Sequence, residues 1–112
     1  MIRIVLLLFV LLAGPALAQD QTTMNRQAED DFKKADTALN QTYKKVIAAL
    51  NGPTKSKLVT AQFLWIKFRD AEAKAYASQA EGGTMYPLLY FGSMSSSTRA
   101  RTQQLKNWLI GN

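Results

Sequence analysis

The segment Leu58–Tyr76, LVTAQFLWIKFRDAEAKAY, decides the fold of this chain. It contains no glycine or proline, and at a helical period it is apolar around most of its circumference. Three polar residues nevertheless lie inside the apolar arc: Gln62, Arg69 and Glu72. An unpaired buried guanidinium is very costly, so Arg69 needs a partner from another element.

A second helix is predicted immediately upstream. From Thr22 or Thr23 the sequence favours a helix, and apolar residues recur at steps of three and four over residues 28–50. This pattern predicts one amphipathic helix of about 28 residues. Asn51-Gly52-Pro53 ends it, because glycine can adopt the left-handed conformation and proline cannot continue the turn. A connection this short makes the two helices antiparallel neighbours, and the sequence therefore predicts a helical hairpin.

The hairpin places a possible partner near Arg69. On a helical wheel Asp36 falls inside the apolar arc of the first helix, and Asn40 lies one turn further along at its edge. We expect an Asp36–Arg69 pair, with Asn40, Gln62 and Glu72 completing the hydrogen bonds. The alternative is that Asp36 and Arg69 both reach solvent.

The rest of the chain predicts shorter elements. Gly82-Gly83 ends the second helix, Met85–Phe91 is a short apolar segment that forms a helix or an ordered loop, and Gly92–Ser97 resembles a loop. A last helix carries Leu105 and Trp108 on its apolar side. The predicted fold is all-α: a long antiparallel helical hairpin, with a short third segment and a C-terminal helix packed across it.

The N-terminus has the pattern of a secretory signal peptide. Arg3 precedes an apolar run over residues 4–12, and Ala16-Leu17-Ala18 forms a cleavage signal. The run is shorter than the ~20 residues that span a bilayer, although a membrane anchor or a core helix is the alternative. We expect cleavage of residues 1–18, a single domain over residues 19–112, and a periplasmic or secreted protein.

Composition excludes several kinds of chemistry. The chain has no histidine and no cysteine, so the usual catalytic triads, zinc sites and disulfides are not expected. Its carboxylates are scattered along the helices, and no EF-hand or phosphate-binding motif is present. We therefore predict a protein without catalytic activity, cofactor or metal. The net charge is +6, and +5 without Arg3, which favours acidic partners; nucleic acid is not expected for an exported protein.

Two motifs resemble a known family. They are Ala35-Asp36-x-x-Leu39-Asn40-x-x-Tyr43 and Gln62-x-x-Trp65-x-x-Phe68-Arg69-Asp70-Ala71-Glu72. Their order and spacing resemble the small exported domain of the LprI-like lysozyme inhibitor family, over nearly all of the mature chain. The resemblance implies a helical cell-envelope domain that inhibits lysozyme. Members commonly carry cysteines where this chain has Gln27, Ala73 and approximately Ser93.

Three functions are compatible with these observations. The first is a lysozyme-inhibitor-like protein that binds through loops; the candidate residues are Gly82, Gly83, Thr84, Ser95, Ser96 and Arg99. Lysozymes are usually strongly basic, which opposes a basic inhibitor. The second is a module attached to an anionic membrane surface or another envelope protein through Lys33, Lys34, Lys44, Lys45, Lys55 and Lys57. The third is a structural protein without a dedicated ligand. The oligomeric state is not predicted.

Overall fold

The protein is a bundle of three long helices. The computed structural model describes the backbone of residues 2–111 and the side chains of residues 20–110. The helices are α1 (Ile2–Ala49), α2 (Gly52–Ala77) and α3 (Tyr86–Gly111), and the 3₁₀ turn η1 (Ser78–Ala80) extends α2. No strand occurs in residues 2–111. The predicted all-α class is confirmed.

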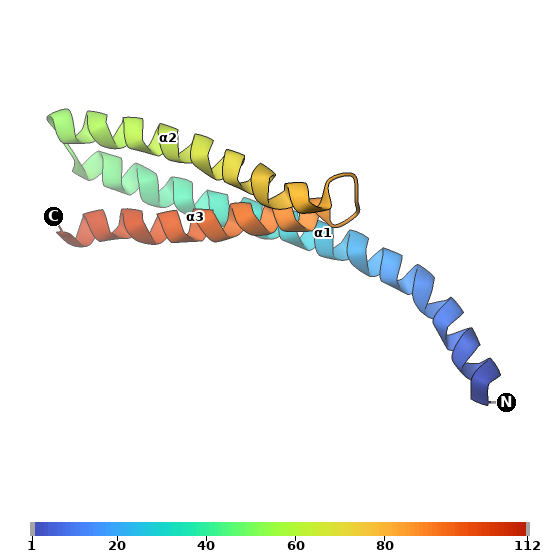
Figure 1. Cartoon of the computed structure of the whole chain (residues 1–112). Helices are drawn as coiled ribbons and strands as arrows, with labels where there is room; N and C mark the ends of the chain where they lie inside the picture. The colour runs from blue at the N-terminus through green and yellow to red at the C-terminus, as the bar shows by residue number, and fades with distance from the viewer. Residues whose placement is uncertain (1, 112) are drawn as a thin grey trace.

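α1 and α3 run in the same direction along the bundle, and α2 runs in the opposite direction (Figure 1). α1 and α2 form the predicted antiparallel hairpin, and α3 returns alongside it, antiparallel to α2. α3 packs against both partners, most extensively against α1. The N-terminal part of α1 extends beyond the bundle, whereas the C-terminus lies beside the α1–α2 turn (Figure 1).

The α1–α2 turn follows from three residues. Gly52 has a φ of +59°, the left-handed conformation that glycine adopts without strain. Asn51 is the extended N-cap of α2, and Pro53 occupies the first turn, where no helical N–H bond is lost. The predicted stop is therefore confirmed.

The core lies between the turn and the middle of the bundle. Its buried cluster is formed by large aliphatic side chains of the three helices and of Leu50, which follows α1: Leu39, Val46, Leu50, Leu58 and Leu105. Tyr43, Ile47 and Trp65 pack against this cluster. The stripe of α1 predicted from its periodicity supplies most of these residues.

The predicted loop at Gly92–Ser97 is wrong. These residues are part of α3, so the short third segment and the C-terminal helix are one continuous element. Met94 and three small polar residues extend the apolar stripe of α3: Ser95, Thr98 and Thr102 are buried, as is Leu105. Tertiary packing thus overrides the loop preference of glycine and serine. Only the Gly82–Thr84 part of the expected loops lies outside a helix.

We expect Gly92→Ala to stabilise the protein by about 0.5–1 kcal/mol, because alanine favours the helix and restricts the unfolded chain. A Cβ at Gly92 meets no atom within 4 Å, and its φ is not positive. Gly82→Ala is the matched control: its site is equally open, but its φ of +79° strains any L-residue. Urea unfolding should move in opposite directions for the two variants. A destabilised Gly92→Ala variant would contradict a helical Gly92.

The predicted signal peptide coincides with the beginning of α1. α1 is continuous from Ile2, whereas the sequence predicts its start near residue 22. The side chains of residues 1–19 lie outside the described part, and cleavage after Ala18 stays a prediction. Within the described residues, no helix combines the length and apolar character needed to cross a membrane.

Candidate functional site

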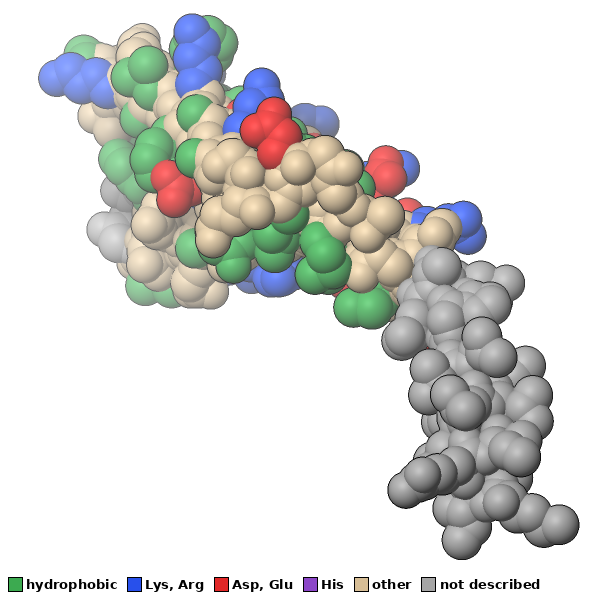
Figure 2. All heavy atoms as spheres, turned by 45° about the vertical axis from the view of Figure 1, so that its right-hand side comes forward, with side chains coloured by type: hydrophobic (Ala, Val, Ile, Leu, Met, Phe, Trp, Pro, Cys, Tyr) green, Lys and Arg blue, Asp and Glu red, His purple; other side chains and the backbone are tan. Residues whose placement is uncertain are grey.

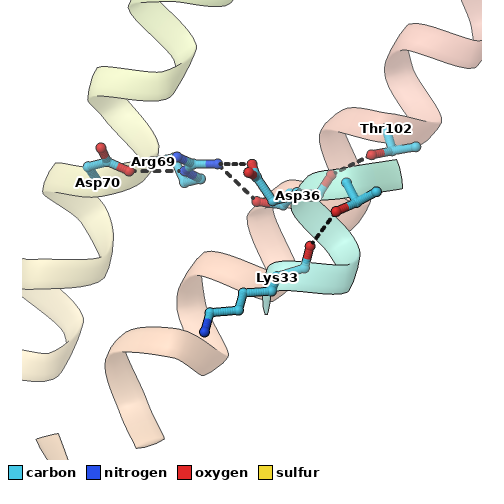
Figure 3. A network of polar contacts seen from close by, with 7 residues as sticks. Lys33, Asp36, Arg69, Asp70 and Thr102 are labelled. Atoms are coloured by element: carbon cyan, nitrogen blue, oxygen red, sulfur yellow. Dashed lines mark hydrogen bonds and ion pairs between the residues drawn. The ribbon is translucent and has the colours of Figure 1, made fainter. Parts of the chain in front are cut away.

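Arg69 is the centre of a polar cluster that joins all three helices (Figure 3). Its side chain is only 9% exposed. Nη1 lies 3.4 Å from Oδ1 of Asp36 in α1 and donates to Oγ1 of Thr98 in α3 at the same distance. Nε donates to Oδ1 of the neighbouring Asp70 at 3.0 Å. The structure therefore brings the predicted Asp36–Arg69 pair together and adds two partners.

Aromatic rings enclose the same guanidinium. Its Cζ atom lies 5.3 Å from the ring centroid of Phe32 and 5.2 Å from that of Trp65, which gives cation–π contacts. The carboxylates of Asp36 and Asp70 are 39% and 41% exposed, so each keeps water on its outer side. The pair thus avoids part of the desolvation cost of a fully buried ion pair. The cluster has a structural role, because it holds the three helices together.

A second arginine, Arg101 of α3, forms a hydrogen bond to α2. Nε of Arg101 in α3 donates to Oε1 of the buried Gln62 at 2.9 Å, and Nη1 donates to Gln104 at 3.2 Å. Burial lowers the pKa of the Arg101 guanidinium below its usual value. The expected partner of Gln62 was Arg69; instead Gln62 accepts from Arg101.

Two residues expected in the cluster lie outside it. Asn40 and Glu72 are both exposed, and neither forms a hydrogen bond or ion pair with Arg69. Glu72 lines a groove on the α2–α3 side instead. The sequence places Asn40 at the edge of one apolar arc and Glu72 inside the other, and a small rotation of each helix turns such a side chain from the interior to water.

The loop between η1 and α3 protrudes from one end of the bundle (Figure 1). Residues 81–85 are exposed, and Gly82 adopts a φ of +79°. The carbonyl of Thr84 accepts a hydrogen bond of 2.8 Å from Nδ2 of Asn25, which ties the loop to α1. Gly82, Gly83 and Thr84 are therefore placed where a partner can reach them.

The other candidate contact residues are helical. Ser95 is 3% exposed, and its hydroxyl finds no hydrogen-bond partner within the described residues, so it is not accessible to a partner protein. Ser96 and Arg99 are exposed on α3. The prediction that these three residues form a binding loop is wrong, because the helix packs continuously through them.

An open groove of about 530 Å³ runs between the end of α2 and the first turns of α3. Its lining combines apolar and hydroxyl-bearing residues with one carboxylate: Glu72, Tyr76, Leu88, Leu89, Gly92, Ser93, Ser96 and Ser97. Sequence analysis missed this groove, because it exists only when residues 88–97 are helical. The groove lies next to the protruding loop and offers a surface for a protein or peptide partner.

Three aromatic residues of α3 form a row beside Phe32. From the sequence they were predicted only as part of an apolar segment. Tyr86 stacks on Tyr90, Tyr90 meets Phe91 edge-on at 5.1 Å, and Phe91 lies 6.1 Å from Phe32. Burial, together with the Asp70 carboxylate, raises the pKa of the Tyr90 phenol. This row holds the start of α3 against α1, and so positions the loop.

The family comparison decides the relationship of the chain. The family model described as "Lysozyme inhibitor LprI" matches residues 14–105. The chain belongs to this family. A relative from Rhizobium meliloti (strain 1021), named only as an uncharacterised protein, is 34% identical over 102 residues, which cover 80% of this chain and 73% of the relative. No solved structure matches the chain significantly.

Charge is segregated along this LprI-family chain. The Arg69 cluster divides the bundle into a loop end, residues 20–36 and 70–98, and a turn end, residues 37–69 and 99–110. The loop end contains all eight carboxylates and only four Lys/Arg, whereas the turn end contains nine Lys/Arg and no carboxylate. The expected basic cluster is therefore split: Lys33 and Lys34 lie at the loop end, where Lys33 pairs with Glu29 at 3.5 Å.

Proposed function

We propose that this protein is an exported, non-enzymatic lysozyme inhibitor that binds lysozyme through its loop end. Membership of the LprI family supports the kind of activity. The observation that carries the choice of surface is the concentration of every carboxylate at the end that also presents the loop and the groove.

The distribution of charge removes an objection to inhibition. A strongly basic enzyme is repelled by a partner whose net charge is +5, if that charge is spread evenly. The loop end, however, carries twice as many acidic as basic residues. It attracts a basic enzyme at short range and orients the encounter, so that the turn end faces away.

The loop end also offers groups that suit a lysozyme active site. Lysozymes work with two carboxylates in a cleft, and a blocking segment must offer hydrogen-bond donors to them. The exposed hydroxyl of Thr84 provides such a donor at the tip of the bundle. Glu81 beside it and Glu72 in the groove can pair with basic residues at the rim of the cleft.

Export requires that residues 1–18 act as a signal peptide. The mass of the protein recovered from the periplasm or medium tests this, and a mature chain that begins at Gln19 is expected. An uncleaved chain in the membrane fraction would contradict it.

We expect the parent protein in molar excess to slow the lysis of bacterial cell walls by lysozyme, and the double variant Glu72→Gln/Glu81→Gln to need a roughly tenfold higher concentration. Both glutamates are exposed, so the fold is retained. The matched control is Lys44→Gln/Lys106→Gln, which changes two exposed charges at the turn end. It should inhibit at least as well as the parent, because it lowers the net positive charge.

The assay is run at low and moderate salt with several classes of lysozyme. Undiminished lysis in every condition would refute inhibition. Equal weakening by both double variants would refute the assignment of the loop end as the binding surface.

A further inference from the structure

The outer face of α2 is apolar although no helix of the bundle covers it. Five large apolar side chains of α2, within residues 59–68, are between 38% and 60% exposed: Val59, Phe63, Leu64, Ile66 and Phe68. They lie on the sides of the helix that turn away from the buried Leu58, Gln62 and Arg69. Soluble monomers rarely expose so contiguous an apolar surface without a partner.

Basic residues surround this outer face. Lys67 lies on it, with Nζ 4.5 Å above the ring of Phe63, and Lys55 and Lys57 lie in the preceding turns. Arg69 forms ion pairs, but the other eight Lys/Arg of the turn end form none among the described side chains. The upper left end of Figure 2 shows basic and hydrophobic side chains next to one another. The face therefore combines apolar area with positive charge that no carboxylate neutralises.

We propose that the outer face of α2 binds the surface of an anionic phospholipid bilayer, with the helix lying parallel to the membrane. Helices with apolar side chains flanked by lysine lie in the interface: the apolar groups enter the acyl boundary and the ammonium groups meet the phosphates. Residues 55–68 extend over about 20 Å, which suits a helix lying in the interface and is too short to span the bilayer.

The C-terminal turn of α3 presents further exposed apolar residues at the turn end of the bundle. The C-terminus lies beside the α1–α2 turn (Figure 1). Ile110 there is 83% exposed, and Trp108 and Leu109 are 38% and 39% exposed. An amphipathic tryptophan is well suited to the headgroup region. Exposed apolar residues of two helices and unpaired basic residues thus lie at the turn end, and both suit an anionic membrane surface.

A second copy of the chain is a poorer occupant. A symmetric dimer places the same patch of both subunits in contact. Two turn ends, each with eight basic side chains outside any ion pair, would then face one another and repel. Lipid phosphates, in contrast, neutralise these charges. The proposal does not depend on lysozyme binding, which was assigned to the loop end.

Cosedimentation with vesicles tests the proposal. We expect the protein to bind vesicles of phosphatidylglycerol and phosphatidylcholine at low salt, and to be released by about 0.5 M NaCl. Phe63→Ser/Phe68→Ser keeps every charge and should reduce partitioning roughly tenfold. Lys67→Glu should reduce it similarly. The matched controls are Met24→Ser and Lys34→Glu, exposed residues of the loop end, which should bind like the parent.

Any one of the following three results would overturn the proposal. Equal binding to vesicles of pure phosphatidylcholine would show that the negative charge of the lipid does not contribute to binding. Unchanged binding of Phe63→Ser/Phe68→Ser would show that the apolar face takes no part. A parent that sediments as a dimer without lipid, and a double variant that is monomeric, would assign the face to a second copy. All variants share one N-terminus, so residues 1–19 cannot cause a difference between them.

Discussion

Arg69→Ala is expected to lower the free energy of unfolding by about 3 kcal/mol, and the melting temperature by roughly 15 °C. The substitution removes the hydrogen bonds of the guanidinium to Asp36, Asp70 and Thr98. It also leaves a space between Phe32 and Trp65, against which the guanidinium stacks. The loss falls at the lower end of the range for buried pairs because both carboxylates retain contact with water.

Urea unfolding followed by circular dichroism measures this effect. Arg99→Ala is the control, because it removes an exposed arginine from α3 and should change stability by less than about 0.5 kcal/mol. An Arg69→Ala variant as stable as the Arg99→Ala variant would show that the cluster contributes no net stability. If the variant loses stability while retaining full lysozyme inhibition well below its melting temperature, the cluster acts on the fold alone.

The hairpin could be predicted from the sequence because its determinants are local. A long apolar stripe in α1, the Asn51-Gly52-Pro53 stop and a helix-compatible α2 each require only neighbouring residues. The approach of Asp36 to Arg69 followed from the hairpin, because a short turn leaves few ways to align two helices. Asp70 was not predicted as a partner, since adjacent residues on a helix point in different directions, and only the long, flexible arginine side chain makes the contact possible.

The charge segregation could not be predicted from the sequence without the topology. The absence of Asp and Glu from residues 37–69 and 99–110 is visible in the sequence. Its meaning depends on the topology, because only an α3 that runs parallel to α1 brings these two segments to the same end. The sequence interpretation placed Lys33 and Lys34 in one cluster with Lys55 and Lys57. The fold places them on opposite sides of the Arg69 cluster, and the proposed binding of a basic enzyme at the loop end depends on this separation.

The error in α3 has a physical cause. Glycine and four serines within residues 92–97 favour a turn when they are judged one by one. Met94 and Ser95, however, are buried in the bundle, and Ser95 has no hydrogen-bond partner for its hydroxyl among the described residues. The packing gained along the whole helix outweighs these local preferences.

Ser96→Pro tests the continuity of α3 directly, and we expect it to cost about 3 kcal/mol or more. Ser96 is exposed and helical, so proline removes a backbone hydrogen bond and its ring collides with the carbonyl four residues earlier, without disturbing any buried side chain. In a loop the same substitution would be nearly neutral. Ser96→Ala is the control and should be neutral or slightly stabilising, because alanine is the better helix former. Far-ultraviolet circular dichroism during thermal unfolding compares the two variants. If both melt together, Gly92–Ser97 is not helical and the groove beside it, which requires a straight α3, does not exist in the form described.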